Sequence, residues 1–276
     1  MGIVIGAVGV VLIAFSMLFA VEVKVSPSKL VKRWGQSRVI VGQPKQLSYN
    51  ELAKAVIPEQ GKTVLVEWGD VGKKLVEAGA IDMTKLGKNF PNLTDEEREV
   101  LVGDDLHQIT FTGDNIIFWT DVLWALGLTQ KSKVLSEGPM MQNKERTPVA
   151  NYASTAGWTL GAKDAMKLYN SQRLITLTPE QDELVYKIAD NIFRPCCGNS
   201  AAYPDCNHGM AVLGLLELMA SQGASEAEMY KAALAFNSYA FSSTYITAAA
   251  YFDKQGIDWS DVKAEEVLGA KFSGGQ

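Results

Sequence analysis

Residues 116–128 constrain the fold most strongly, because they are apolar almost all the way round a helix. Their sequence, IIFWTDVLWALGL, has one charged residue, Asp121, in thirteen positions. A helix that is hydrophobic on every side is stable in a water-soluble protein only when other elements cover it. We therefore expect a deeply buried helix at these residues.

Helix start and stop signals recur along the chain and predict a mainly helical fold. Thr94 with Glu97, and Thr178 with Gln181, have the spacing of a capping box, and Ser225 opens a further helix. Apolar residues at helical spacing predict the other helices, which we place at residues 47–54, 71–78, about 207–222 and about 245–254.

Strand signals are few and short, at residues 64–66 and 109–112, so a small two-stranded ribbon is the most that we expect. Residues 138–161 contain several glycines and prolines and predict an irregular connection. The expected fold is mainly α, with an N-terminal transmembrane helix followed by an antiparallel helical bundle. We divide the chain into an anchor (1–21), a helical region of unassigned role (22–160) and a bundle that carries a Cys/His loop (161–276).

The first 21 residues contain no charged side chain and have the length of one bilayer-spanning helix. They lack the basic start and the small-residue cleavage site of a secretory signal, so an uncleaved anchor is expected. The positive-inside rule would place the basic residues that follow this segment in the cytoplasm: Lys24, Lys29, Lys32 and Arg33. A hydrophobic N-terminus on an otherwise soluble chain nevertheless usually serves export. We expect an extracytoplasmic soluble part and a protein partner in the cell envelope.

Charge and motif content argue against two other classes of function. The net charge is -5 and no basic stripe or RNA-binding motif is present, so nucleic acid is not an expected partner. Residues 60–63 (QGKT) resemble the end of a phosphate-binding loop, but Val56 stands where that motif requires its first glycine. No nucleotide cofactor is therefore expected.

All three cysteines and one of the two histidines fall within thirteen residues. Thiolates and imidazole are ligands of zinc and copper, which makes this set a candidate metal site: Cys196, Cys197, Cys206 and His208. Met210 shares a helix face with Cys206 and would add a thioether. Adjacent cysteines depart from the usual spacing of structural zinc sites, and two thiolates with His208 or Met210 would suit Cu(I). His107 has no such neighbours and is expected to be a solvated loop residue.

Two alternatives use the same three cysteines, Cys196, Cys197 and Cys206, without a metal. Cys206 is expected at a helix N-terminus, which favours the thiolate and would suit the attacking thiol of a thiol-disulfide exchange protein. A structural disulfide from Cys206 to Cys196 or Cys197 would instead clip two helices together in a non-catalytic scaffold. Metal binding, with Zn or Cu, is the leading hypothesis, and the sequence leaves open whether the protein is an enzyme.

The cysteine loop also carries a partial family resemblance. A helix precedes Cys196-Cys197, Asp205-Cys206-Asn207 follows, and residues 223–229 (GASEAEM) open another helix. In this order residues 178–241 resemble the CcmH-type periplasmic thiol proteins of cytochrome c maturation, and the general pattern is similar to membrane-anchored Cys-motif proteins. The resemblance implies an exported, anchored three-helix unit whose cysteines exchange disulfides with other proteins. This chain differs in having adjacent cysteines where that family has C-x-x-C.

Overall fold

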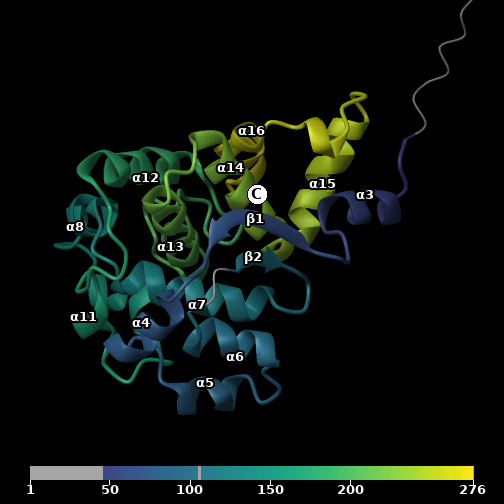
Figure 1. Cartoon of the computed structure of the whole chain (residues 1–276). Helices are drawn as coiled ribbons and strands as arrows, with labels where there is room; N and C mark the ends of the chain where they lie inside the picture. The colour runs from purple at the N-terminus through teal and green to yellow at the C-terminus, as the bar shows by residue number, and fades with distance from the viewer. Residues whose placement is uncertain (1–45, 105–106, 276) are drawn as a thin grey trace, which may run out of the picture. The chain divides into compact units, whose positions relative to one another are not determined.

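Helix α13 (Asn207–Ser221) lies at the centre of the core and is buried from Gly209 to Ala220. The computed structural model describes residues 46–104 and 107–275 (Figure 1). The most extensive packing of α13 is against α7 (Ile116–Thr129), and it also contacts α12 (Pro179–Asn191) and α14 (Glu226–Ala240). Figure 1 shows these helices gathered around α13, so the mainly helical fold is confirmed.

Helices α7 and α13 approach each other closely because each has a glycine where they cross. A Cβ atom on Gly127 would overlap the carbonyl oxygen of Met210, and a Cβ atom on Gly214 would overlap that of Leu123. The backbones are therefore in direct contact at this crossing. The prediction of a deeply buried helix at residues 116–128 is confirmed, since nearly every side chain of α7 is buried.

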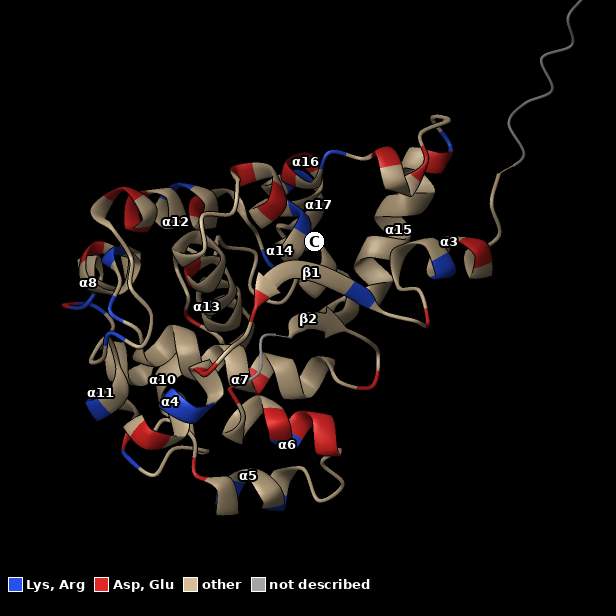
Figure 2. Ribbon diagram, in the orientation of Figure 1, with Lys and Arg blue, Asp and Glu red and all other residues tan. Residues whose placement is uncertain are grey.

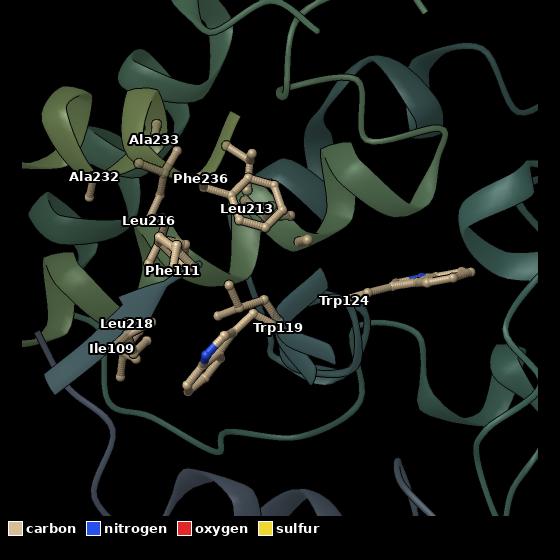
Figure 3. Packing of buried hydrophobic residues seen from close by; sticks show 14 of the residues in the cluster. Ile109, Phe111, Trp119, Trp124, Leu213, Leu216, Leu218, Ala232, Ala233 and Phe236 are labelled. Atoms are coloured by element: carbon tan, nitrogen blue, oxygen red, sulfur yellow. The ribbon is translucent and has the colours of Figure 1, made fainter. Parts of the chain in front are cut away.

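A two-stranded antiparallel ribbon, β1 (Lys62–Glu67) and β2 (Gln108–Phe111), packs against α14 and reaches α7 through Phe111. Its inner face joins a chain of edge-to-face aromatic contacts (Figure 3). Phe111 lies 5.5 Å from Phe236 and 6.3 Å from Trp119, between ring centroids. Trp68 lies 5.2 Å from Trp119. These contacts fix the ribbon between α7 and α14, and the predicted two-stranded ribbon is confirmed.

Shorter helices surround the central ones. Before α7 these are α3 (Tyr49–Val56), α4 (Val71–Ala78), α5 (Met83–Asn89) and α6 (Asp95–Val102). Between α7 and α12 lie α8 (Lys133–Glu137), α9 (Pro139–Gln142), η1 (Val149–Asn151), α10 (Ala153–Ala156) and α11 (Ala165–Leu168). After α14 come α15 (Ser242–Asp253), η2 (Trp259–Asp261), α16 (Ala264–Leu268) and α17 (Ala270–Ser273).

Local capping determines where several helices begin. Thr94, Thr178 and Ser225 each form both hydrogen bonds of a capping box, and Ser48 does the same before α3. Helix α15 starts at Ser242, earlier than the expected 245. Residues 138–161 are irregular as predicted, but they include the short helices α9 and α10.

Residues 46–276 form one compact unit, and its main hydrophobic cluster takes residues from both sides of position 160. Figure 2 shows that charged residues lie mostly on the outer helices, with an acidic group on α6.

The predicted anchor at residues 1–21 lies outside the described residues. Among the residues that the structure describes, no helix is both long and apolar enough to cross a membrane.

Candidate thiol and metal site

The loop between α12 and α13 folds back on itself and brings the predicted site residues together. Helix α12 ends at Asn191, and the backbone N–H groups of Cys197 and Gly198 donate to the carbonyl of Arg194 in a tight turn, at 3.2 and 2.9 Å. Phe193 and Ser200 then form an isolated antiparallel bridge. The loop ends at Cys206, which is the N-cap residue of α13.

The three sulfur atoms lie close to one another at the surface. Cys196 Sγ is 3.2 Å from Cys197 Sγ and 3.7 Å from Cys206 Sγ. Cys196 and Cys197 are exposed and Cys206 is partly buried, and all three are free thiols. The ligand atoms of Cys196, Cys206 and His208 all lie within 4.8 Å of one another, as do those of Cys197, Asp205 and Cys206. The loop therefore presents two overlapping sets of three ligands.

Arg194 is the fully buried centre of this loop, with 0% of its side chain exposed. Its Nη1 donates to Cys206 Sγ at 3.1 Å. Its Nη2 donates to a group of oxygens on the loop: the side-chain oxygen of Asn199, the carbonyls of Ser200 (3.1 Å) and Tyr203 (2.9 Å), and Asp205 Oδ1 (3.2 Å). One guanidinium thus contacts both the loop and the first sulfur of the next helix.

Asp205 fixes the end of the loop to its neighbours. Its Oδ2 accepts a hydrogen bond from Asn199 Nδ2 at 2.9 Å, and its carbonyl accepts one from the backbone N–H of Ser154 at 3.0 Å. The carbonyl of Ser154 in turn accepts from Trp124 Nε1 at 2.8 Å. The site is therefore connected by hydrogen bonds through α10 to α7.

The electrostatics of the three thiols differ strongly. The pKa of Cys206 is held far below that of a free thiol, chiefly by the hydrogen bond from Cys196. His208, the Arg194 guanidinium and the backbone N–H of Gly209 also lower this pKa, while burial opposes them. The pKa of Cys196 is raised, chiefly by its hydrogen bond to Cys206, and burial raises the pKa of Cys197. A single thiolate on Cys206, shared with neutral thiols, is the favoured state.

His208 lies in the first turn of α13 beside an acidic group from α7. Its ring packs at 4.6 Å from the ring of Phe241, between centroids. Burial raises the pKa of the Asp121 carboxyl to about 6, and the nearby His208 opposes this rise. Sequence analysis noted Asp121 as the lone charge of an apolar helix without assigning it a role, and the structure places it near the imidazole. Carboxylates near a ligating histidine commonly support metal binding.

Two other residues considered in the sequence analysis, Met210 and His107, are wholly or partly buried. Met210 is fully buried and belongs to the main hydrophobic cluster. His107 lies in a loop, as predicted, but it is only partly exposed, and its Nε2 atom is buried without a hydrogen-bond partner. The carbonyl of His107 accepts from the backbone N–H of Trp68 at 3.0 Å, which holds His107 beside the residue that follows β1.

Sequence analysis gave no ligand or positioning role to three residues of this site: Arg194, Asn199 and Asp205. Their only sequence signal is position, because each lies within two residues of a cysteine. Comparison with protein-family models, with curated proteins and with solved structures finds no match to this chain.

Proposed function

We propose that the loop between α12 and α13 binds a soft or borderline metal ion, Zn(II) or Cu(I), and that the protein handles or stores this metal. The observation that carries the proposal is the convergence of Cys196, Cys206 and His208, whose ligand atoms all lie within 4.8 Å of one another. Two thiolates and one imidazole are a ligand set that both ions accept.

The sulfur spacing supports an ion with three or four ligands. A tetrahedral ion with metal–sulfur bonds of about 2.3 Å holds its sulfur atoms about 3.8 Å apart. Cys196 Sγ and Cys206 Sγ are separated by 3.7 Å. A linear two-coordinate ion with bonds of that length would need roughly 4.6 Å between the two sulfurs. Cys197 Sγ is close enough to supply a further thiolate.

The exposure of the thiols favours a metal that is exchanged over one that only holds the fold together. Structural zinc sites are closed, and small domains depend on them for folding. Here Cys196 and Cys197 are exposed, while the core of the protein is built from a large hydrophobic cluster. The membrane anchor at residues 1–21, the extracytoplasmic location and the antiparallel bundle arrangement are part of the same proposal.

The test is the metal content of the full chain, purified anaerobically. We expect about one Zn or Cu per chain, bound by the wild type and lost in Cys206→Ser. Met210→Leu is the matched control, because it removes a buried sulfur while conserving side-chain volume. If this variant keeps the metal, the Met210 thioether belongs to the core. If it loses the metal, the thioether belongs to the site. Absence of bound and of rebound metal in the wild type would overturn the proposal.

Thiol-disulfide exchange is the second candidate, and the contact of Arg194 with Cys206 favours it. In such a step the Cys206 thiolate attacks a partner's disulfide, one partner sulfur leaves as a thiolate, and a mixed disulfide forms. The thiol of Cys196 or Cys197 loses its proton and displaces the second partner sulfur, which leaves the partner reduced and this chain oxidised. For this function we expect the disulfide formed in this chain to have a reduction potential within the range of thiol-disulfide exchange proteins. A structural disulfide would have a lower potential.

A further inference from the structure

We infer that Arg194 is the positioning residue of the site, and that it holds Cys206 and the cysteine loop in ligating geometry before a metal ion arrives. The identity of the ligand rests on the proposed function. The positioning of the loop rests on contacts among the protein's own residues, so the two can be tested separately.

The contacts of Arg194 span the loop from one end to the other. Its guanidinium reaches Asn199, Ser200, Tyr203 and Asp205 on the loop, and Cys206 Sγ at the start of α13. Nη1 faces the sulfur and Nη2 faces the four oxygens, so two nitrogens of one planar group contact both sides of the site. A lysine ammonium carries the same charge at a single point, so it cannot replace the arginine here.

The space for the guanidinium depends on a glycine in the first turn of α13. A Cβ atom on Gly209 would overlap Arg194 Nη1 and would lie 3.1 Å from the Cα of Pro204. A side chain at this position would therefore push the guanidinium away from Cys206 while leaving every cysteine, the histidine and the charge of Arg194 in the sequence. Gly209→Ala thus alters the position of the cation without removing it.

Fixing the sulfur atoms in advance has a chemical purpose. The sulfur of Cys206 is partly buried, so it needs a hydrogen-bond donor in place of water. Arg194 Nη1 supplies that donor at 3.1 Å and keeps the sulfur in place beside the other ligands. The loop then loses little conformational freedom when the ion binds, which favours tight and reversible binding.

The experiment uses the full chain and Co(II) as the spectroscopic probe of Zn(II) sites. We compare the wild type with Arg194→Lys, Gly209→Ala and the milder Asn199→Ala, and we use Arg173→Lys, at an exposed position, as the control. The affinity for Co(II) is expected to fall about 10–100-fold in the first two variants, the usual cost of losing a residue that supports a ligand. The thiolate-to-cobalt absorption per bound ion is expected to fall as well, which a general loss of stability would not produce.

A second measurement keeps the inference testable without metal. Amide hydrogen exchange over residues 196–206 of the metal-free protein should be faster in Gly209→Ala and Asn199→Ala, with exchange in α7 unchanged. If the wild type binds no Co(II), the proposed function fails and this exchange result alone decides the role of Arg194. Unchanged exchange together with unchanged Co(II) binding in these variants would overturn the inference.

Discussion

The sulfur atoms of Cys196 and Cys206 lie 3.7 Å apart, although the two residues are ten positions apart in the sequence. This spacing is too long for a disulfide, whose S–S bond is about 2.05 Å, and it suits two ligands of one ion. Closing the bond would require the sulfurs to move together by roughly 1.7 Å. The proposed metal binding and an oxidation to the disulfide would therefore compete for the same pair of atoms.

Oxidation should remove the metal site. Treatment of the metal-free protein with oxidised glutathione is expected to join Cys206 to Cys196 and to leave one free thiol per chain. Peptide mapping by mass spectrometry identifies the pair, and the oxidised protein should no longer bind Zn(II). A bond between the adjacent residues Cys196 and Cys197, or three thiols that stay reduced, would contradict this prediction.

The two histidines should differ in their effect on metal binding. His208→Ala removes an imidazole that lies beside the sulfurs. We expect its zinc affinity to fall at least as much as the roughly 10–100-fold that loss of a supporting residue costs. His107→Ala is the matched control and should bind zinc like the wild type. Equal affinities for both variants, measured by competition with a chelator, would exclude His208 as a ligand.

A side chain added at the glycine crossing of α7 and α13 should lower the stability of the protein. Gly127→Ala places a Cβ against the carbonyl oxygen of Met210. It should lower the free energy of unfolding by about 1–3 kcal/mol, the usual cost of overpacking a core. Gly87→Ala is the control, because a Cβ in that helix meets nothing within 4 Å. It should stabilise by about 0.5–1 kcal/mol, and urea unfolding measures both.

Glu217 should make the stability of the protein depend on pH. Burial raises the pKa of this carboxyl well above its usual value, and the nearby Ser132 hydroxyl opposes the rise. The folded state keeps the proton, while the unfolded state loses it above a pH of about 4.3. The stability contribution is therefore complete below that pH and is lost as the pH rises through the pKa of the folded state.

Glu217→Gln removes the titrating carboxyl and its pH-dependent contribution to stability. The variant should therefore lose less stability than the wild type between pH 4 and pH 8. Urea midpoints at both pH values measure the difference. The pKa of Asp121 is also raised, to about 6, and contributes to the slope of both proteins. Only the difference between variant and wild type is therefore informative. Parallel pH profiles would show that Glu217 has no part in the effect.

Features that depend on neighbouring residues could be predicted from the sequence. A capping box joins residues only three apart, as Thr178 and Gln181 show, so it can be recognised from the sequence alone. The apolar helix and the clustered cysteines were predicted for the same reason. Arg194 was not, because its role depends on a loop that returns to meet the next helix and on a glycine that leaves it room. Asp121 joins the site only through the packing of α7 near His208.

The hydrogen bonds that link Asp205 through Ser154 to Trp124 have a practical consequence. They couple the loop to an indole ring whose partner, Trp158, lies only 4.9 Å away between ring centroids. Two hydrogen bonds through Ser154 thus separate Asp205 from this tryptophan pair. A change in the loop that displaces Asp205 should therefore alter the intrinsic tryptophan fluorescence of the unlabelled chain.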